Sequence, residues 1–203
     1  MIQKIDYAIA GLVGFFAGMF AIPTLVNLGF RDAVMLLAIP WIAAGIFVFG
    51  IWVSALLARK ISFFAQFGKF AAVGVLNTVI DFGVLNLLSS AAGITTGLIV
   101  GGVNVPGFLV AVANSYFWNK LWVFKNKEKL FSDLPQFLAV TVGGLIVNSI
   151  LVAGITTYIS APFGIMPTTW LNLAKAIATA FTLVWNFTGY KFLVFRQKTA
   201  VNA

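Results

Sequence analysis

The chain has no cysteine and no histidine among its 203 residues, and only 5 residues are acidic. Without cysteine it has no disulfide and no thiol nucleophile. Without either residue type it lacks the usual zinc ligands and the usual base of a nucleophilic site. Its carboxylates are too sparse for a paired-carboxylate or metal-dependent transferase site. We therefore expect no enzymatic activity, no catalytic residue, no bound metal and no cofactor.

Charge of either sign is also scarce. Charged residues make up 9% of the chain, whereas soluble domains carry about 25%. Hydrophobic residues make up 61%, and the mean hydropathy is +1.03. The net charge of +8 sits in short basic clusters between long apolar runs. That distribution indicates contact with anionic membrane lipids and no nucleic-acid partner. No phosphate-binding glycine loop is present, so ATP is not expected to drive the chain directly.

Six apolar segments each reach the length of about 20 residues that a membrane-spanning helix needs. The first has a short basic start, as a signal peptide does, but it has no clear cleavage site and is long enough to be a retained helix. The pattern predicts an all-α, polytopic membrane helix bundle with six transmembrane helices. The six segments are residues 7–26, 33–57, 67–88, 99–118, 137–158 and 169–190.

Positive charges fall almost entirely on one side of such a six-helix path. Arg31 is alone on the other side, and Lys175 lies within a helix. Lysine and arginine mark the cytoplasmic side of a membrane protein. The chain is therefore predicted to lie in the cytoplasmic (inner) membrane with both termini in the cytoplasm. Trp122 lies near an inner boundary and is expected to be an interfacial anchor. The eleven charges on the cytoplasmic side are Lys4, Arg59, Lys60, Lys69, Lys120, Lys125, Lys127, Lys129, Lys191, Arg196 and Lys198.

The last four segments contain an internal repeat. Residues 66–77 resemble residues 136–148, and residues 115–124 resemble residues 186–195, at offsets of 70 to 71. Each half holds two helices, so the halves are predicted to be parallel two-helix repeats. Two interpretations remain: the repeats enclose a shared interior, or duplication only produced a stable four-helix scaffold.

Within the repeat, one series of residues resembles the GtrA-like family over about residues 64–196. The pattern F-x-x-V-G-x-x-N-T-x-x-D is followed by N-K-x-W-x-F on the next helix. The matching residues are Phe70, Val73, Gly74, Asn77, Thr78, Asp81, Asn119, Lys120, Trp122 and Phe124. The resemblance implies a two-helix N-terminal extension over residues 1–62 and a GtrA-like four-helix membrane domain over residues 63–203. The two helices of the extension are expected to form either a contact in a homo-oligomer or a lateral gate.

The resemblance implies translocation (flipping) of a polyprenyl-phosphate-linked sugar across the cytoplasmic membrane for cell-surface polysaccharide or glycan synthesis. A second function class is a non-transporting membrane scaffold that recruits or stabilises a glycosyltransferase, and a third is a small-solute permease. The expected partners are therefore the lipid-linked sugar, anionic lipids and a glycosyltransferase. The second half departs from the pattern, with Tyr190 where the first half has Asn119.

Two ionisable residues, Asp81 and Lys175, lie within predicted spans. A charge in hydrocarbon is costly, so such residues usually face a protein interior and find partners. Counted at ~1.5 Å per residue, both lie about 10 Å below the outer boundary. We expect them to pair in the empty protein, with the lysine released to a substrate phosphate. The alternative is a structural salt bridge or two unrelated polar contacts.

Amides and lysines complete the predicted substrate-binding set. Asn77 and Asn148 occupy equivalent positions of the repeat, where they would line a shared cavity or simply join helices. At the cytoplasmic mouth, four residues are predicted to collect an anionic headgroup, although their lysines are equally explained by the positive-inside rule and anionic lipid. These four are Lys69, Asn119, Lys120 and Lys191.

Overall fold

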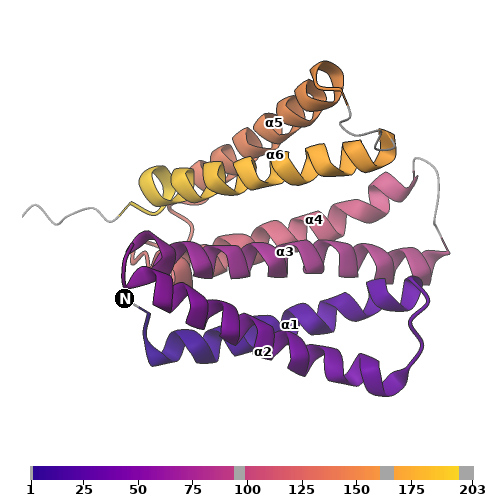
Figure 1. Ribbon diagram of the computed structural model, residues 1–203, viewed down its shortest axis with the longest axis horizontal. Helices are drawn as coiled ribbons and strands as arrows, with labels where there is room; N and C mark the ends of the chain where they lie inside the picture. The colour runs from indigo at the N-terminus through magenta and orange to yellow at the C-terminus, as the bar shows by residue number, and fades with distance from the viewer. Residues whose placement is uncertain (1, 94–98, 161–166, 197–203) are drawn as a thin grey trace, which may run out of the picture. The chain divides into compact units, whose positions relative to one another are not determined.

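The computed structural model describes residues 2–93, 99–160 and 167–196, and for parts of the last three α-helices it describes the backbone alone. Over these residues all regular secondary structure is helical, with six α-helices and two short π-helical turns (Figure 1). In chain order they are α1 (Lys4–Asn27), α2 (Ala33–Ala58), α3 (Phe63–Ala92), α4 (Ile99–Trp118), η1 (Asn119–Val123), α5 (Leu134–Tyr158), α6 (Pro167–Gly189) and η3 (Tyr190–Val194).

Each of the six expected segments coincides with an α-helix. The largest differences are at α3, which runs four residues beyond the predicted segment 67–88 at each end. Among the described residues, α1, α2 and α3 are long and apolar enough to cross a membrane. With 24, 26 and 30 residues, they measure about 36 to 45 Å at ~1.5 Å per residue, more than a hydrocarbon core of about 30 Å.

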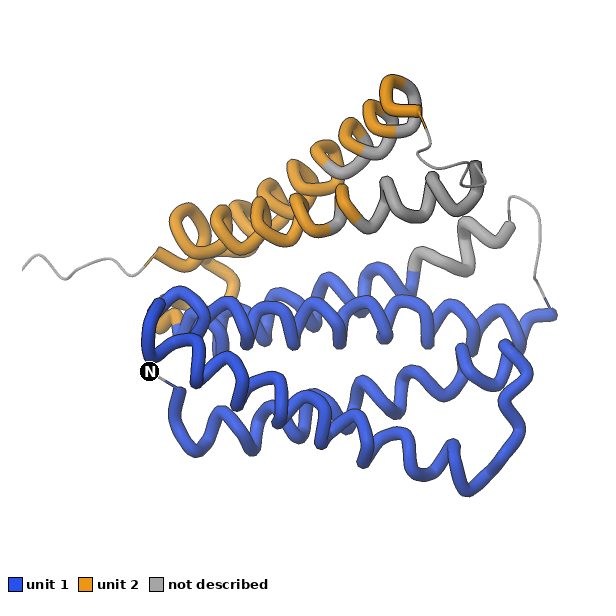
Figure 2. The backbone as a smooth tube through the Cα atoms, viewed as in Figure 1, with its two compact units in different colours: residues 1–125 blue, residues 126–203 orange. Residues whose placement is uncertain are grey.

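The chain forms two compact units (Figure 2). Unit 1 is residues 1–125, with α1 to α4 and η1, and unit 2 is residues 126–203, with α5, α6 and η3. Within unit 1, α3 packs against α1, α2, α4 and η1. The first two helices therefore share a compact unit with the next two, and the predicted division between residues 62 and 63 remains a prediction.

Small residues let α1 approach both of its neighbours closely. A Cβ atom at Gly18 would collide with the backbone of Pro40 in α2. A Cβ atom at Gly83 of α3 would collide with the carbonyl oxygen of Phe20 in α1. Helices that approach this closely gain van der Waals contact, which is the main packing force where water is absent.

Hydrogen bonds also join α1 and α3 at one pair of ends. Asn27 Nδ2 donates to Asn86 Oδ1 at 2.9 Å, and Asn86 Nδ2 donates to Thr24 Oγ1 at 3.2 Å. Ser90 Oγ donates to Asn27 Oδ1 at 3.0 Å. These side chains satisfy one another where the two helices finish side by side.

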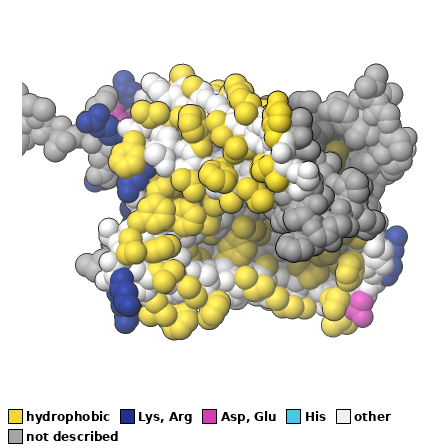
Figure 3. Space-filling model, turned by 45° about the horizontal axis from the view of Figure 1, so that its top comes forward, with side chains coloured by type: hydrophobic (Ala, Val, Ile, Leu, Met, Phe, Trp, Pro, Cys, Tyr) yellow, Lys and Arg dark blue, Asp and Glu magenta, His cyan; other side chains and the backbone are white. Residues whose placement is uncertain are grey.

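The described surface of the helices is largely apolar. Only Pro40 and Ile51 are buried in α2, while Trp41 is 71% exposed and Leu37 is 73% exposed. On the face drawn in Figure 3, hydrophobic side chains cover the helices and lysine and arginine gather at their ends. An apolar belt with charged ends is typical of helices that lie in a bilayer.

In unit 2, α5 packs against α6 and η3 through aromatic side chains. The rings of Phe137 and Tyr190 stack with centroids 4.7 Å apart. Trp185 Nε1 donates to the carbonyl oxygen of Val140 at 3.2 Å. Beside them lies an apolar groove of about 520 Å³, lined by Val140, Val147, Phe181, Val184, Trp185, Thr188, Gly189, Phe192 and Leu193.

Candidate functional site

A line of polar side chains runs along the contact between α3 and α4. Asn77 and Asp81 are four residues apart on α3 and therefore lie on one face of that helix. Asn114 Nδ2 of α4 donates to Asn77 Oδ1 at 2.6 Å. The predicted Asn77 thus contacts a second amide that the sequence analysis did not place in the site.

Asp81 lies at a close approach of α3 and α4. A Cβ atom at Gly107 would stand 2.7 Å from the carbonyl oxygen of Asp81 and 3.0 Å from its Oδ1. Within the described part of the chain, this buried Oδ1 has no hydrogen-bond partner. A buried acceptor without a partner in an apolar helix is a recurrent feature of functional sites. It can accept a hydrogen bond from a hydroxyl or bind a cation.

The predicted partner of Asp81, Lys175, lies on α6 outside the described side chains, and so does Asn148 on α5. The structure therefore does not test the expected ion pair or the expected equivalence of Asn77 and Asn148. Both remain predictions.

Asn119 and Lys120 lie in η1, the π-helical turn that ends α4. The turn is closed by a hydrogen bond from Phe124 N to Asn119 O at 2.9 Å. Both side chains are 1% exposed. Asn119 Nδ2 donates to Ser115 O at 2.8 Å, but its buried Oδ1 has no partner among the described residues. Lys120 Nζ lies 5.9 Å from the ring centroid of Tyr116. The turn thus holds an amide and a cation inside the protein.

A second π-helical turn, η3, ends α6 at the position 71 residues later. Phe195 N donates to Tyr190 O at 2.8 Å, which is the counterpart of the bond that closes η1. Lys191 Nζ lies 5.7 Å from the ring centroid of Phe187, as Lys120 does from Tyr116. Tyr190, which replaces Asn119, exchanges a hydrogen bond of 2.7 Å with Thr141. π turns are rare and often mark functional positions. The two turns lie 71 residues apart, which is the offset of the repeat in the sequence.

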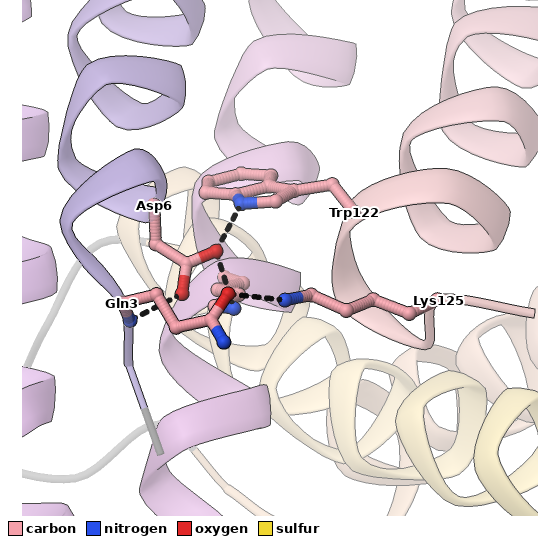
Figure 4. Close-up of polar contacts among 5 residues, drawn as sticks. Gln3, Asp6, Trp122 and Lys125 are labelled. Carbon is pink, nitrogen blue, oxygen red and sulfur yellow. Dashed lines mark hydrogen bonds and ion pairs between the residues drawn. The ribbon is translucent and has the colours of Figure 1, made fainter.

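Lys69 is buried in unit 1 and forms a salt bridge. Its Nζ lies 2.7 Å from Oδ1 of Asp6, and the side chains are 5% and 0% exposed. Trp122 Nε1 donates to the same Oδ1 at 3.0 Å, and Gln3 N donates to Asp6 Oδ2 at 2.8 Å. Lys125 Nζ donates to Gln3 Oε1 at 3.2 Å. Figure 4 shows Asp6 between Gln3 and Trp122, with Lys125 directed at Gln3.

Asp6 is not among the site residues predicted from the sequence, and Trp122 was expected to be an interfacial anchor. Trp122 is instead 2% exposed, because its indole N–H faces the Asp6 carboxylate. One signal was available in the sequence. Lys69 lies inside an apolar helix, where a cation requires an anionic or polar partner.

The structure thus brings most of the predicted residues of unit 1 into two places. Asn77 and Asp81 line the contact of α3 with α4. Lys69 joins Asp6 and Trp122, and Trp122 shares η1 with Asn119 and Lys120. Lys191 lies in unit 2, in the equivalent turn.

Comparison with known proteins identifies the type of domain. A family model described as "GtrA/DPMS, transmembrane domain" matches residues 69–195. The uncharacterized membrane protein YngA of Bacillus subtilis (strain 168) is 30% identical over 129 residues, which are 63% of this chain and 78% of that protein. A bactoprenol-linked glucose translocase of Shigella phage SfV is 32% identical over 131 residues, 64% of this chain and 95% of the translocase.

A third relative is matched over a smaller part of its length. The dolichol-phosphate mannosyltransferase of Pyrococcus furiosus is 31% identical over 85 residues, 41% of this chain and 23% of that protein. No solved structure matches the chain. Given its apolar helices and the extent of the family match, the chain is a multi-pass membrane protein that belongs to the GtrA/DPMS transmembrane domain family.

Proposed function

We propose that the protein translocates a polyprenyl-phosphate-linked sugar across the cytoplasmic membrane for cell-surface polysaccharide or glycan synthesis. The observation that carries this proposal is the match to bactoprenol-linked glucose translocases over 95% of their length. The polar line of Asn77 and Asp81 inside apolar helices supports it, because such side chains suit the hydroxyls of a sugar. The proposal makes the protein a transporter without catalytic activity.

In this proposal a cavity between the two repeats accepts the sugar-phosphate. Asp81 and Lys175 form an ion pair in the empty protein, and the lysine transfers to the substrate phosphate during passage. Asn77 and Asn148 contribute amides from equivalent positions of the two halves. The polyprenyl tail remains in lipid, and consumption of the carrier on the far side sets the net direction.

The phosphate would first be collected at the cytoplasmic ends of the helices. The residues proposed to bind it are Lys69 of α3, Asn119 and Lys120 of η1, and Lys191 of η3. A lysine binds phosphate as a point charge and needs no fixed geometry. The arrangement requires six membrane crossings with both termini in the cytoplasm, as the distribution of positive charge favours.

A second candidate function is a membrane scaffold that recruits or stabilises a glycosyltransferase. The specific observation in its favour is the match to 23% of a dolichol-phosphate mannosyltransferase, most of which lies outside the matched segment. A domain of this type is thus present within a glycosyltransferase. In this alternative the protein binds its enzyme partner but moves no lipid.

Reconstitution into liposomes separates the two functions. Purified protein is incorporated into vesicles that contain a fluorescent polyprenyl-phosphate glucose, and transfer between leaflets is followed by a membrane-impermeant quencher. Faster transfer with the protein than with empty vesicles supports the translocase. Unchanged transfer, together with stable binding of a glycosyltransferase, would replace the translocase by the scaffold. Vesicles that contain Asp81→Asn protein provide the matched control.

A further inference from the structure

The surroundings of Asp6 have the form of an oxyanion-binding site that is already filled. Its Oδ1 accepts from the Lys69 ammonium at 2.7 Å and from the Trp122 indole N–H at 3.0 Å. Its Oδ2 accepts from the backbone N–H of Gln3 at 2.8 Å. A carboxylate oxygen held by an ammonium and an indole is geometrically equivalent to one oxygen of a phosphate held by the same donors.

The donors and the carboxylate come from different parts of the chain. Lys69 and Trp122 lie within the family match at residues 69–195, whereas Asp6 lies outside it. The phage translocase is matched over 95% of its length, whereas the match covers 64% of this chain. The translocase therefore has too little remaining chain to supply two further helices, and the carboxylate that fills the site belongs to an addition in this chain.

We propose that Lys69 and Trp122 form a phosphate-binding site that Asp6 of α1 occupies as an internal, competing anion. When a phosphate-bearing ligand takes the two donors, the first turn of α1 moves away from η1. The ligand class is a phosphate monoester or diester, either on a lipid or free. For a lipid-linked headgroup the inference rests on the proposed function; for free phosphate it does not.

Charge and contacts support an exchange of anions at this position. Without the Asp6 carboxylate the buried Lys69 ammonium would have no ion-pair partner among the described residues, so another anion would be drawn to it. The part of α1 that must move is small, because Gln3, Lys4 and Ile5 are exposed. Lys125 is also exposed and holds the same turn through Gln3 at 3.2 Å. The two oxygens of Asp6 thus have different partners. Oδ2 accepts from the backbone of Gln3 at the start of its own helix, and Oδ1 accepts from Lys69 and Trp122.

The first experiment measures phosphate binding to purified protein in detergent. We expect Asp6→Asn to bind farnesyl phosphate and inorganic phosphate at least tenfold more tightly than the unsubstituted chain. The double variant Asp6→Asn/Lys69→Met should lose this gain, because it removes the cation. If both probes bind more tightly to Asp6→Asn, a free phosphate is sufficient as the ligand. If only farnesyl phosphate binds more tightly, the ligand is a phosphate on a lipid. No gain in folded Asp6→Asn, or a gain that persists without Lys69, overturns the proposal.

The second experiment retains Asp6 and applies even where Asp6→Asn does not fold. The chain has no cysteine, so Gln3→Cys/Lys125→Cys can be bridged specifically by a reducible bifunctional methanethiosulfonate. Asn27→Cys/Ser90→Cys, which bridges α1 to α3 at the opposite ends, is the matched control. We expect the first bridge to reduce liposome transfer at least tenfold and reduction to restore it, with no effect of the control bridge.

The outcomes keep the two proposals apart. Equal transfer with and without the first bridge overturns the role of Asp6 and leaves the translocase intact. No transfer by the unsubstituted chain overturns the translocase. Phosphate binding to Asp6→Asn then still decides whether Lys69 and Trp122 form an anion site.

Discussion

At the scale of single residues, the buried pair of Asp6 and Lys69 makes unit 1 sensitive to single substitutions. The Asp6 and Lys69 side chains are 0% and 5% exposed. Burial of either charge is favourable only while the two form an ion pair. Removal of one partner leaves an uncompensated charge in a medium of low polarity. The cost of substitution therefore depends on whether one member or both are replaced.

We expect Lys69→Met to lower the free energy of unfolding by about 3 to 5 kcal/mol, because it leaves the Asp6 carboxylate buried without its cation. The double variant Asp6→Leu/Lys69→Met should recover most of that loss. Denaturation of detergent-solubilised protein, followed by tryptophan fluorescence, measures both. A double variant as unstable as the single one would contradict the pairing.

Asp81 is the residue on which the proposed substrate path depends most directly. Its buried Oδ1 has no hydrogen-bond partner among the described residues, so it is available to a substrate hydroxyl. We expect Asp81→Asn to reduce lipid-linked sugar transfer in liposomes at least tenfold, because it removes the carboxylate that is proposed to bind the sugar and to pair with Lys175. A folded Asp81→Asn variant that transfers at the unsubstituted rate would remove Asp81 from the proposed path.

At the scale of helices, close approach between backbones holds unit 1 together. Gly83 of α3 admits the carbonyl of Phe20, and Gly107 of α4 admits Asp81. These positions tolerate no side chain without a shift of a whole helix. By contrast, a Cβ atom at Gly45 of α2 would meet nothing within 4 Å.

We therefore expect Gly83→Val to destabilise the protein by about 1 to 3 kcal/mol through overpacking. Gly45→Ala is the matched control and should be neutral or slightly stabilising, because alanine favours a helix over glycine. Thermal aggregation of the purified variants compares them directly. Equal loss of stability in both would show that the α1–α3 approach is not limiting.

Much of the helical architecture was predictable, because a run of about 20 apolar residues specifies a spanning helix regardless of its neighbours. The first and last turns of α3 were missed, since they extend beyond the apolar run into polar residues such as Gln66. The contacts of Asp6 were not predictable, because its partner Trp122 is 116 positions away. The π turns were also missed: Asn119 and Tyr190 differ in chemistry, and although Gly189 precedes η3, no proline or glycine lies within η1 or η3 to signal a break.

At the scale of the whole molecule, the charge distribution and the number of helices together predict how the chain is oriented in the membrane. The natural absence of cysteine makes every introduced thiol unique. Thiols introduced at Gln3, Arg59 and Lys127 should react with a membrane-impermeant reagent only from the cytoplasmic side, and a thiol at Arg31 only from the outside. Labelling of intact cells and of inverted vesicles measures this. Reaction of positions 3 and 127 from opposite sides would rule out an even number of crossings between them.

The bond between Asp6 and Trp122 has a consequence for biosynthesis. A membrane protein is made from its amino terminus, and earlier segments are inserted while later ones are still being translated. The Asp6 carboxylate leaves the ribosome long before Lys69 and Trp122 exist, so it must stay hydrated at the membrane surface until α3 and η1 have been made. Its position in the first turn of α1, at the edge of the apolar run, allows that delay. Unit 1 therefore completes its packing only after its last residues have been translated. A nascent chain halted before Trp122 would expose an incompletely packed helix bundle to cellular quality control.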